Sequence, residues 1–135
     1  MRVAIRKREV SEVGSLLEDY RQLACLFCEV EWRVYQRLFP GARTRLDEFR
    51  HLLEEHLAIE ERAAPPQAKS TEDAARIQYD LQKHHALRRI AQKAGDAIDA
   101  HDPQAFSSLA SDLVEVLALH ANAAASNAPQ NIKPH

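Results

Sequence analysis

The sequence predicts an all-α fold, an antiparallel up-down-up-down four-helix bundle, on the basis of three observations. Four segments, at about residues 10–38, 44–64, 70–100 and 103–125, repeat apolar residues every three or four positions, as amphipathic helices do. The connections between them are short, which favours antiparallel neighbours. Glycine occurs only 3 times in 135 residues, whereas Ala, Leu, Glu and Arg are abundant, and this composition favours helix over sheet.

Local signals support each helix boundary. The Phe-Pro-Gly sequence at 39–41 is expected to end the first helix, and the two prolines at 65–66 to end the second. Residues 70–73 (STED) form a capping box that predicts the start of the third helix. Asp102 and Pro103 fit the N-cap and first position of the fourth. We therefore expect one bundle over residues 1–125 and a flexible C-terminal tail over residues 126–135.

Composition narrows the class of protein. The net charge of −2 argues against a nucleic-acid partner, and no apolar run approaches the roughly 20 residues of a membrane span. The first ten residues, MRVAIRKREV, lack the apolar segment of a secretory signal. Cys25 and Cys28 lie too close together to staple a fold. These observations predict a cytoplasmic protein.

Several polar residues fall on the apolar stripes that should face the core. His56 and Glu60 lie one turn apart on the second helix, and Tyr20, His84 and His120 lie on the stripes of the first, third and fourth. His84 is about 16 residues before the end of its helix and His120 about 17 after the start of the next, so at 1.5 Å per residue they lie at nearly the same level. We expect the five side chains to meet inside one end of the bundle.

Three imidazoles and a carboxylate are costly to bury without partners. One inward histidine by itself predicts only a hydrogen-bonded core residue. Three of them on three helices, with a glutamate one turn from one of them, favour a metal site. Histidine and carboxylate ligands suit iron, zinc or manganese.

Four short segments resemble the hemerythrin-like, or HHE cation-binding, domain family. They are EDYRQL (18–23), LLEEHLAIEER (52–62) followed by Pro65, KHHALR (83–88), and LALH (117–120) followed by Pro129. Their order and spacing cover roughly residues 10–129. The resemblance implies a four-helix bundle holding a non-haem, usually di-iron, site, with His56, Glu60, His84 and His120 as ligands.

The sequence departs from the family pattern at three places. Tyr20 stands where the first helix normally has a histidine, and Arg88 stands where a second histidine would follow His84 by four residues. Ala124 and Ala125 stand where the last helix should supply a carboxylate. The remaining ligands favour one iron ion over two. Tyr20 is either a phenolate ligand or a hydrogen-bonding residue in the space of the missing histidine.

Three functional hypotheses follow. The first is a metal-binding protein that binds or senses a small diatomic ligand, oxygen or nitric oxide, or handles iron. The second is a degenerate scaffold of the same fold that binds no metal and acts through protein–protein contacts. The third is a phosphotransfer module that uses the exposed His85. No residue identifies a substrate, so enzymatic activity is not expected. Trp32 and Tyr35, at the border of the first stripe, are candidates for a homodimer contact or for capping the core.

Overall fold

The structure, a computed structural model, describes the backbone of residues 12–63 and 69–132 and the side chains of residues 18–62 and 69–120. Within these residues it contains four helices and no strand: α2 (Glu12–Tyr35), α3 (Phe39–Ala63), α4 (Thr71–Asp99) and α5 (Pro103–Ile132). The all-α fold class predicted from the sequence is therefore confirmed. No described helix is long and apolar enough to span a membrane.

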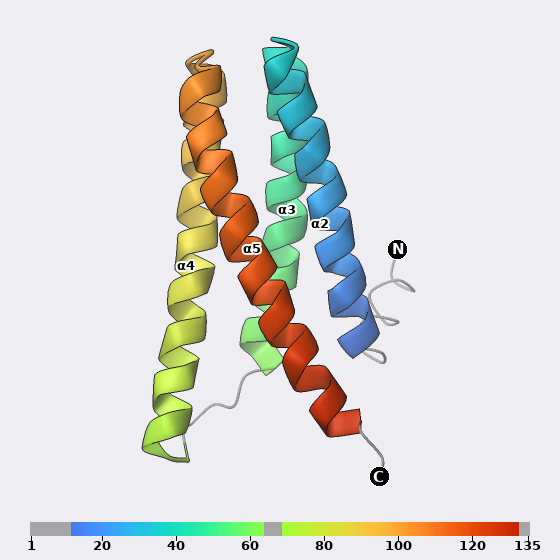
Figure 1. Cartoon of the computed structure of the whole chain (residues 1–135), viewed down its shortest axis with the longest axis vertical. Helices are drawn as coiled ribbons and strands as arrows, with labels where there is room; N and C mark the ends of the chain where they lie inside the picture. Colours follow the sequence, from blue (N-terminus) through green and yellow to red (C-terminus); the bar gives the residue numbers. More distant parts are fainter. Residues whose placement is uncertain (1–11, 64–68, 133–135) are drawn as a thin grey trace.

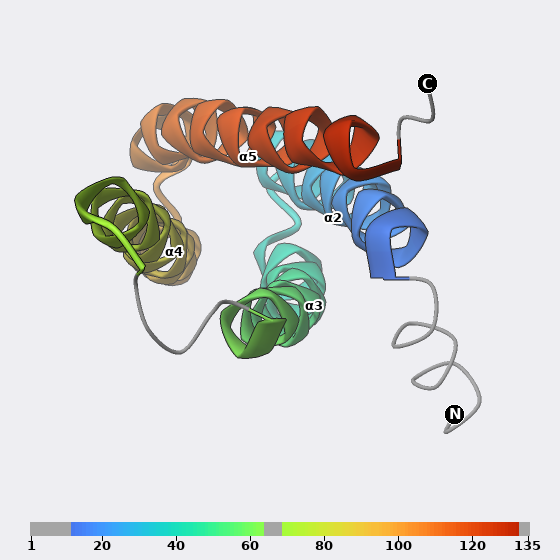
Figure 2. The ribbon, with the colours of Figure 1, turned by 90° about the horizontal axis from the view of Figure 1, so that it is seen from below.

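The four helices pack as a closed ring. The contacting pairs are α2 with α3, α3 with α4, α4 with α5, and α5 with α2. In Figure 1 the end of α2 lies beside the start of α3, and the end of α4 beside the start of α5, at the top of the view. The start of α2 and the ends of α3 and α5 lie in the lower part. The view along the bundle in Figure 2 shows the helices surrounding a common centre.

The boundary between α2 and α3 differs from the prediction. Residues 39–41 do not end the first helix; they begin the second. α2 stops at Tyr35, where Arg37 takes a left-handed conformation (φ 63°) and the amide of Leu38 donates to the carbonyl of Arg33 at 2.8 Å. Pro40 then falls in the first turn of α3, where its missing N–H is not needed for a helical hydrogen bond.

The starts of the last two helices agree with their predicted caps. Ser70 is the N-cap of α4, and its side chain accepts a hydrogen bond from the amide of Asp73 at 3.0 Å. The carboxylate of Asp102 accepts from the amide of Ala105 at 3.1 Å, directly before α5 begins at Pro103. Each side chain satisfies an amide that the helix itself leaves unpaired.

The C-terminal end of α5 extends further than expected. The sequence predicts a flexible tail from Ser126, whereas the helix continues to Ile132. Alanines at 121 and 123–125 have high helix propensity, which favours continuation of the helix past His120. Side chains beyond residue 120 lie outside the described part, including Ala124 and Ala125, where the family pattern expects a carboxylate.

The core is built from one apolar stripe of each helix. Phe27 lies at its centre, with ring centroids 5.2 Å from Phe49 and 5.8 Å from Phe106. All three rings are at most 2% exposed. The surrounding buried residues include Leu23, Val30 and Val34 on α2, Leu46, Leu53 and Leu57 on α3, Leu87, Ala91 and Ile98 on α4, and Leu113 and Leu117 on α5. This packed layer holds the four helices at the spacing that the polar cluster requires.

We expect Phe106→Ala to lower the free energy of unfolding by about 3–5 kcal/mol, because it removes a fully buried ring and leaves a cavity. Urea denaturation of the two proteins measures the difference. Val114→Ala on the same helix is the control, since Val114 is 49% exposed and its loss should change stability by about 0.5 kcal/mol or less. Equal losses for the two variants would contradict the assignment of this core.

Candidate metal centre

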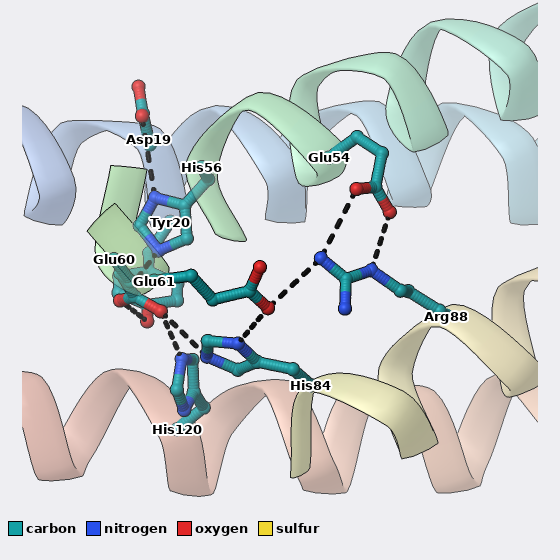
Figure 3. Close-up of polar contacts among 9 residues, drawn as sticks. All are labelled: Asp19, Tyr20, Glu54, His56, Glu60, Glu61, His84, Arg88 and His120. Carbon is teal, nitrogen blue, oxygen red and sulfur yellow. Dashed lines mark hydrogen bonds and ion pairs between the residues drawn. The ribbon is translucent and has the colours of Figure 1, made fainter. Parts of the chain in front are cut away.

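The five residues expected at the site are together in the structure. His56 and Glu60 lie one turn apart on α3 and project from the same face. Tyr20 comes from α2, His84 from α4 and His120 from α5, so every helix contributes (Figure 3). The three histidines and Tyr20 are at most 7% exposed. The inward periodicity and matching depths read from the sequence therefore describe a real cluster.

The carboxylate of Glu60 is the centre of this cluster. Its Oε1 lies 2.6 Å from Nε2 of His120 and 3.0 Å from Nε2 of His84. Its Oε2 accepts a hydrogen bond from the hydroxyl of Tyr20 at 2.9 Å and lies 3.1 Å from Nε2 of His56. One carboxylate thus contacts side chains from all four helices.

Two further carboxylates contact the outer nitrogens of the histidines. Asp19 Oδ2 lies 3.4 Å from Nδ1 of His56, and Glu61 Oε2 lies 2.8 Å from Nδ1 of His84. Asp19 is 2% exposed. A carboxylate on the far side of a histidine ring is the usual partner of a metal-binding imidazole, because it fixes the ring's orientation and tautomer.

Asp19 and Glu61 are not among the site residues predicted from the sequence. Each was visible as the direct neighbour of a candidate residue, Asp19 before Tyr20 and Glu61 after Glu60. The signal that identifies them is an acidic residue adjacent to an inward-facing one, but that pattern is common on helix surfaces. Their contacts depend on how the helices cross, which spacing along one helix does not reveal.

Arg88 points away from the centre of the cluster. Its Nε donates to Glu54 at 2.7 Å, and its Nη2 lies 3.2 Å from the other oxygen of Glu54 and 3.1 Å from Glu61. Figure 3 shows the guanidinium between these two glutamates. The arginine at the position where the hemerythrin-like pattern has a second histidine is therefore neutralised by two acids and does not occupy the space around Glu60.

The cluster sets the ionisation of its two central oxygen groups. Burial by itself would raise the pKa of Glu60, but the close contacts of its carboxylate with His120, His56 and His84 outweigh burial and hold that pKa far below its ordinary value. Burial, reinforced by the negative charge of Glu60, raises the pKa of Tyr20 far above its ordinary value. In this arrangement Glu60 is a carboxylate, and Tyr20 is a neutral phenol that donates to it.

The second carboxylate contact affects His84. Burial would lower the pKa of its imidazole, but hydrogen bonds to Glu60 and Glu61 outweigh burial and raise it. Without a metal ion, this ring holds a proton between two acids. A proton and a metal cation are alternative ways of neutralising the same carboxylates.

The donor set fits a metal ion. His56, Glu60 and His120 each offer an atom, and these atoms lie within 4.8 Å of one another. His84 contacts Glu60 from α4 but lies outside this trio. Nε2 of His56 and Nδ1 of His120 are buried and make no hydrogen bond within the described residues. Nε2 of His56 lies 3.1 Å from Oε2 of Glu60, but the two groups are not oriented as a hydrogen bond. This ring nitrogen is therefore free to act as a ligand.

Other residues considered from the sequence lie away from the cluster. Cys25 and Cys28 are both exposed thiols on α2. His85 is exposed on α4, one residue from the buried His84. Trp32 and Tyr35 are each 55% exposed, so they do not cap the core.

We expect the metal-free protein to be most stable between pH 4.5 and 6.5, the ordinary pKa values of glutamate and histidine. The lowered pKa of Glu60 stabilises the fold above pH 4.5, and this contribution is lost as the pH falls. The raised pKa of His84 stabilises the fold below pH 6.5, and this contribution is lost as the pH rises through its folded value. Urea denaturation of chelator-treated protein across the pH range measures both slopes.

Glu60→Gln should remove the low-pH slope, since the titrating carboxylate is gone, and weaken the high-pH slope, since one of the two carboxylates that raise the pKa of His84 is lost. Glu48→Gln is the matched control, because Glu48 lies on the same helix and pairs with Arg45, away from the cluster. A Glu60→Gln protein with the pH profile of the wild type would contradict the central position of this carboxylate.

No protein-family model, curated protein or solved structure matches this chain.

Proposed function

We propose that this chain is a hemerythrin-like protein that binds one non-haem metal ion, iron, inside an antiparallel up-down-up-down bundle. The ligands are His56, Glu60 and His120, with His84 as the fourth. Tyr20 lies at the same carboxylate and either joins the ligands as a phenolate or donates a hydrogen bond to Glu60. The antiparallel topology is supported by the positions of the helix ends in Figure 1.

The observation that carries this proposal is a trio of two buried imidazoles and one carboxylate, 15% exposed, in which Nε2 of His56 lies 3.1 Å from Glu60 without a hydrogen bond. A buried polar atom without a partner costs about 1–3 kcal/mol, so this nitrogen calls for an explanation. Coordination supplies it, because Nε2 of His56 would bind the ion beside Glu60, and His120 would bind through Nε2, the nitrogen that faces the same carboxylate.

The chemistry of the donors favours iron. Two histidines and one carboxylate with further positions open is the arrangement typical of mononuclear non-haem iron(II). No thiolate takes part, since both cysteines are exposed on α2 away from the trio. Arg88, bound to Glu54 and Glu61, adds no ligand for a second ion.

A site of this kind suits a small diatomic ligand. Iron(II) would supply an open coordination position to oxygen or nitric oxide. The chain's own residues would orient the imidazoles through Asp19 and Glu61, and Tyr20 would offer a hydroxyl beside the carboxylate. Buried Leu53 and Leu117 belong to the apolar core next to these residues and exclude water.

One observation favours the alternative, a scaffold that acts without metal. Glu60 is already contacted by Tyr20 and three histidines, so protons can satisfy much of the cluster. On this alternative the polar cluster only fixes the packing of the helices, and the protein works through contacts on its surface. The two proposals differ in metal content, which decides between them.

We expect purified, untagged protein from iron-supplemented cells to contain close to one iron per chain by mass spectrometry. His56→Ala and His120→Ala should each lose most of this iron, since each removes a member of the trio. His85→Ala is the control, because it deletes an exposed imidazole beside the cluster. Equal iron in the wild type and His56→Ala would overturn the ligand assignment.

A chelator should also lower the melting temperature, because a ligand that binds only the folded state stabilises it. A wild type without metal, and with a melting temperature indifferent to chelator, would favour the scaffold.

The proposal includes a homodimer through Trp32 and Tyr35, whose exposed rings lie one turn apart on α2. Sedimentation velocity over a range of protein concentrations tests this contact. We expect Trp32→Ala to shift the protein towards the monomer, and a wild type that stays monomeric at every concentration would exclude the dimer.

A further inference from the structure

We propose that Glu61 and Arg88 are positioning residues for His84: Arg88 holds the carboxylate of Glu61, and Glu61 holds the imidazole so that Nε2 faces the metal-binding centre. This inference rests on the proposed metal site, since its consequence is a change in metal affinity. It gives a role to the arginine that stands where the family pattern has a histidine.

The first step is the environment of the His84 ring. The ring is 3% exposed and lies between two carboxylates, with Nδ1 at 2.8 Å from Glu61 and Nε2 at 3.0 Å from Glu60. An ionised carboxylate can only accept a hydrogen bond. Both carboxylates therefore compete for the ring hydrogen, and the shorter contact, 2.8 Å to Glu61 against 3.0 Å to Glu60, favours the tautomer with hydrogen on Nδ1. That tautomer leaves Nε2 directed at Glu60 as the potential ligand atom.

The second step is that Glu61 needs a restraint of its own. Its side chain is 32% exposed and belongs to the last turn of α3, which ends at Ala63. A flexible glutamate at such a position loses rotamer freedom when it is fixed, and this costs free energy. Nη2 of Arg88, at 3.1 Å, contacts the same Oε2 atom that faces His84. The arginine thus restrains the oxygen that orients the ring.

The third step is that Arg88 is itself fixed. Glu54 takes both Nε and Nη2, at 2.7 and 3.2 Å, in the two-point geometry that a guanidinium makes with a carboxylate. Arg88 lies four residues after His84 on α4, and Glu61 lies seven after Glu54 on α3, so both pairs project across the same helix–helix contact. Figure 3 shows the resulting series from Glu54 through Arg88 and Glu61 to His84.

The magnitudes favour a role in orientation over one in stability. Ion pairs as exposed as Arg88 with Glu54 typically contribute little to stability, because solvent screens them. The loss of a residue that orients a metal-binding histidine, by comparison, typically weakens metal affinity about 10–100-fold. A lysine at this position would contact one carboxylate oxygen at a time, because it lacks the planar fork of the guanidinium.

The chain offers a matched control for Arg88. Arg43 also links α3 to α4, with Nη1 at 3.1 Å from Asp99 and Nε at 3.3 Å from Asp47. Its side chain is 34% exposed, against 29% for Arg88. It lies 13 residues before His56 on α3, about 20 Å away along the helix. Losing Arg43 should therefore cost similar stability and leave the cluster intact.

The first experiment titrates the metal-free proteins with cobalt(II), whose visible absorption reports binding. We expect Arg88→Gln and Glu61→Ala to bind about 10–100-fold more weakly than the wild type. Arg43→Gln should stay within about twofold, and Arg88→Lys should fall between Arg88→Gln and the wild type. Equal weakening by Arg43→Gln and Arg88→Gln would overturn the proposal, because it would indicate a general loss of stability.

The second experiment needs no metal. Nitrogen-15 NMR of the metal-free protein, at a pH where His84 is neutral, reports which ring nitrogen carries the hydrogen. We expect Nδ1–H in the wild type and a shift towards Nε2–H in Glu61→Ala, because Glu60 is then the remaining carboxylate acceptor. Arg43→Gln should keep the wild-type tautomer.

The two experiments separate the failure of this inference from the failure of the proposed function. A wild type that binds no cobalt overturns the proposed metal site, and the tautomer still decides whether Glu61 orients the ring. A wild type that binds cobalt while Glu61→Ala and Arg88→Gln bind it equally well, with an unchanged tautomer, overturns the positioning role and leaves the metal site standing.

Discussion

The structure depends on one largely enclosed carboxylate, that of Glu60, whose side chain is 15% exposed and contacts residues of all four helices. An isolated ionised glutamate would be costly to bury, and Glu60 is tolerated because Tyr20 and three imidazoles surround it. These contacts also fix the helices along their axes. A shift of any helix by one residue would move its polar side chain about 1.5 Å along the axis and 100° around it, away from Glu60. The apolar core gives cohesion, and the carboxylate gives the helices their register.

The same arrangement accounts for the two candidate functions. Protons on the imidazoles and a divalent cation at the centre neutralise the same negative charge, so metal binding would release protons from the cluster. The described contacts satisfy the carboxylate fully but leave one nitrogen on His56 and one on His120 without a hydrogen bond. A purely structural cluster gains nothing from an unpaired Nε2 of His56 beside Glu60, whereas a metal ligand requires such a free nitrogen.

Periodicity predicted the parts of the site that lie on the inward stripes. His56, Glu60, His84 and His120 could be found because each continues an apolar face, and their depths could be compared through the helical rise. The same reasoning misplaced the start of α3, because Pro and Gly punctuate helices at either end and spacing does not say which. The turn between α2 and α3 is placed by Arg37, which adopts a left-handed conformation. Such a position is usually marked in a sequence by glycine, so an arginine there did not indicate the end of the helix.

The residues that periodicity missed make their contacts across the boundary between two helices. Glu61 is one residue from Glu60 and therefore about 100° around α3, where it would count as a surface acid if α4 did not pass close by. Arg88, one turn after His84, would repel a metal ion if its guanidinium pointed into the cluster. In the structure it points to Glu54 and Glu61 instead. These two acids lie two turns apart on α3, so the planar guanidinium of Arg88 can contact both. Contacts of this kind follow from the distance and crossing of two helices, which the pattern along either one does not contain.

The electrostatics of this end of the bundle favour a cation at its centre. Glu60 and Glu61 lie in the last turn of α3, where the unpaired backbone carbonyls add partial negative charge. Asp19 adds a further buried carboxylate beside His56. The permanently charged cation that contacts this group in the described structure, Arg88, is held at its edge by Glu54 and neutralises only the outermost acid. The interior is left with more negative charge than fixed positive charge. Imidazole protons can balance it at low pH, and at higher pH a metal ion is the species of the right sign and size to replace them.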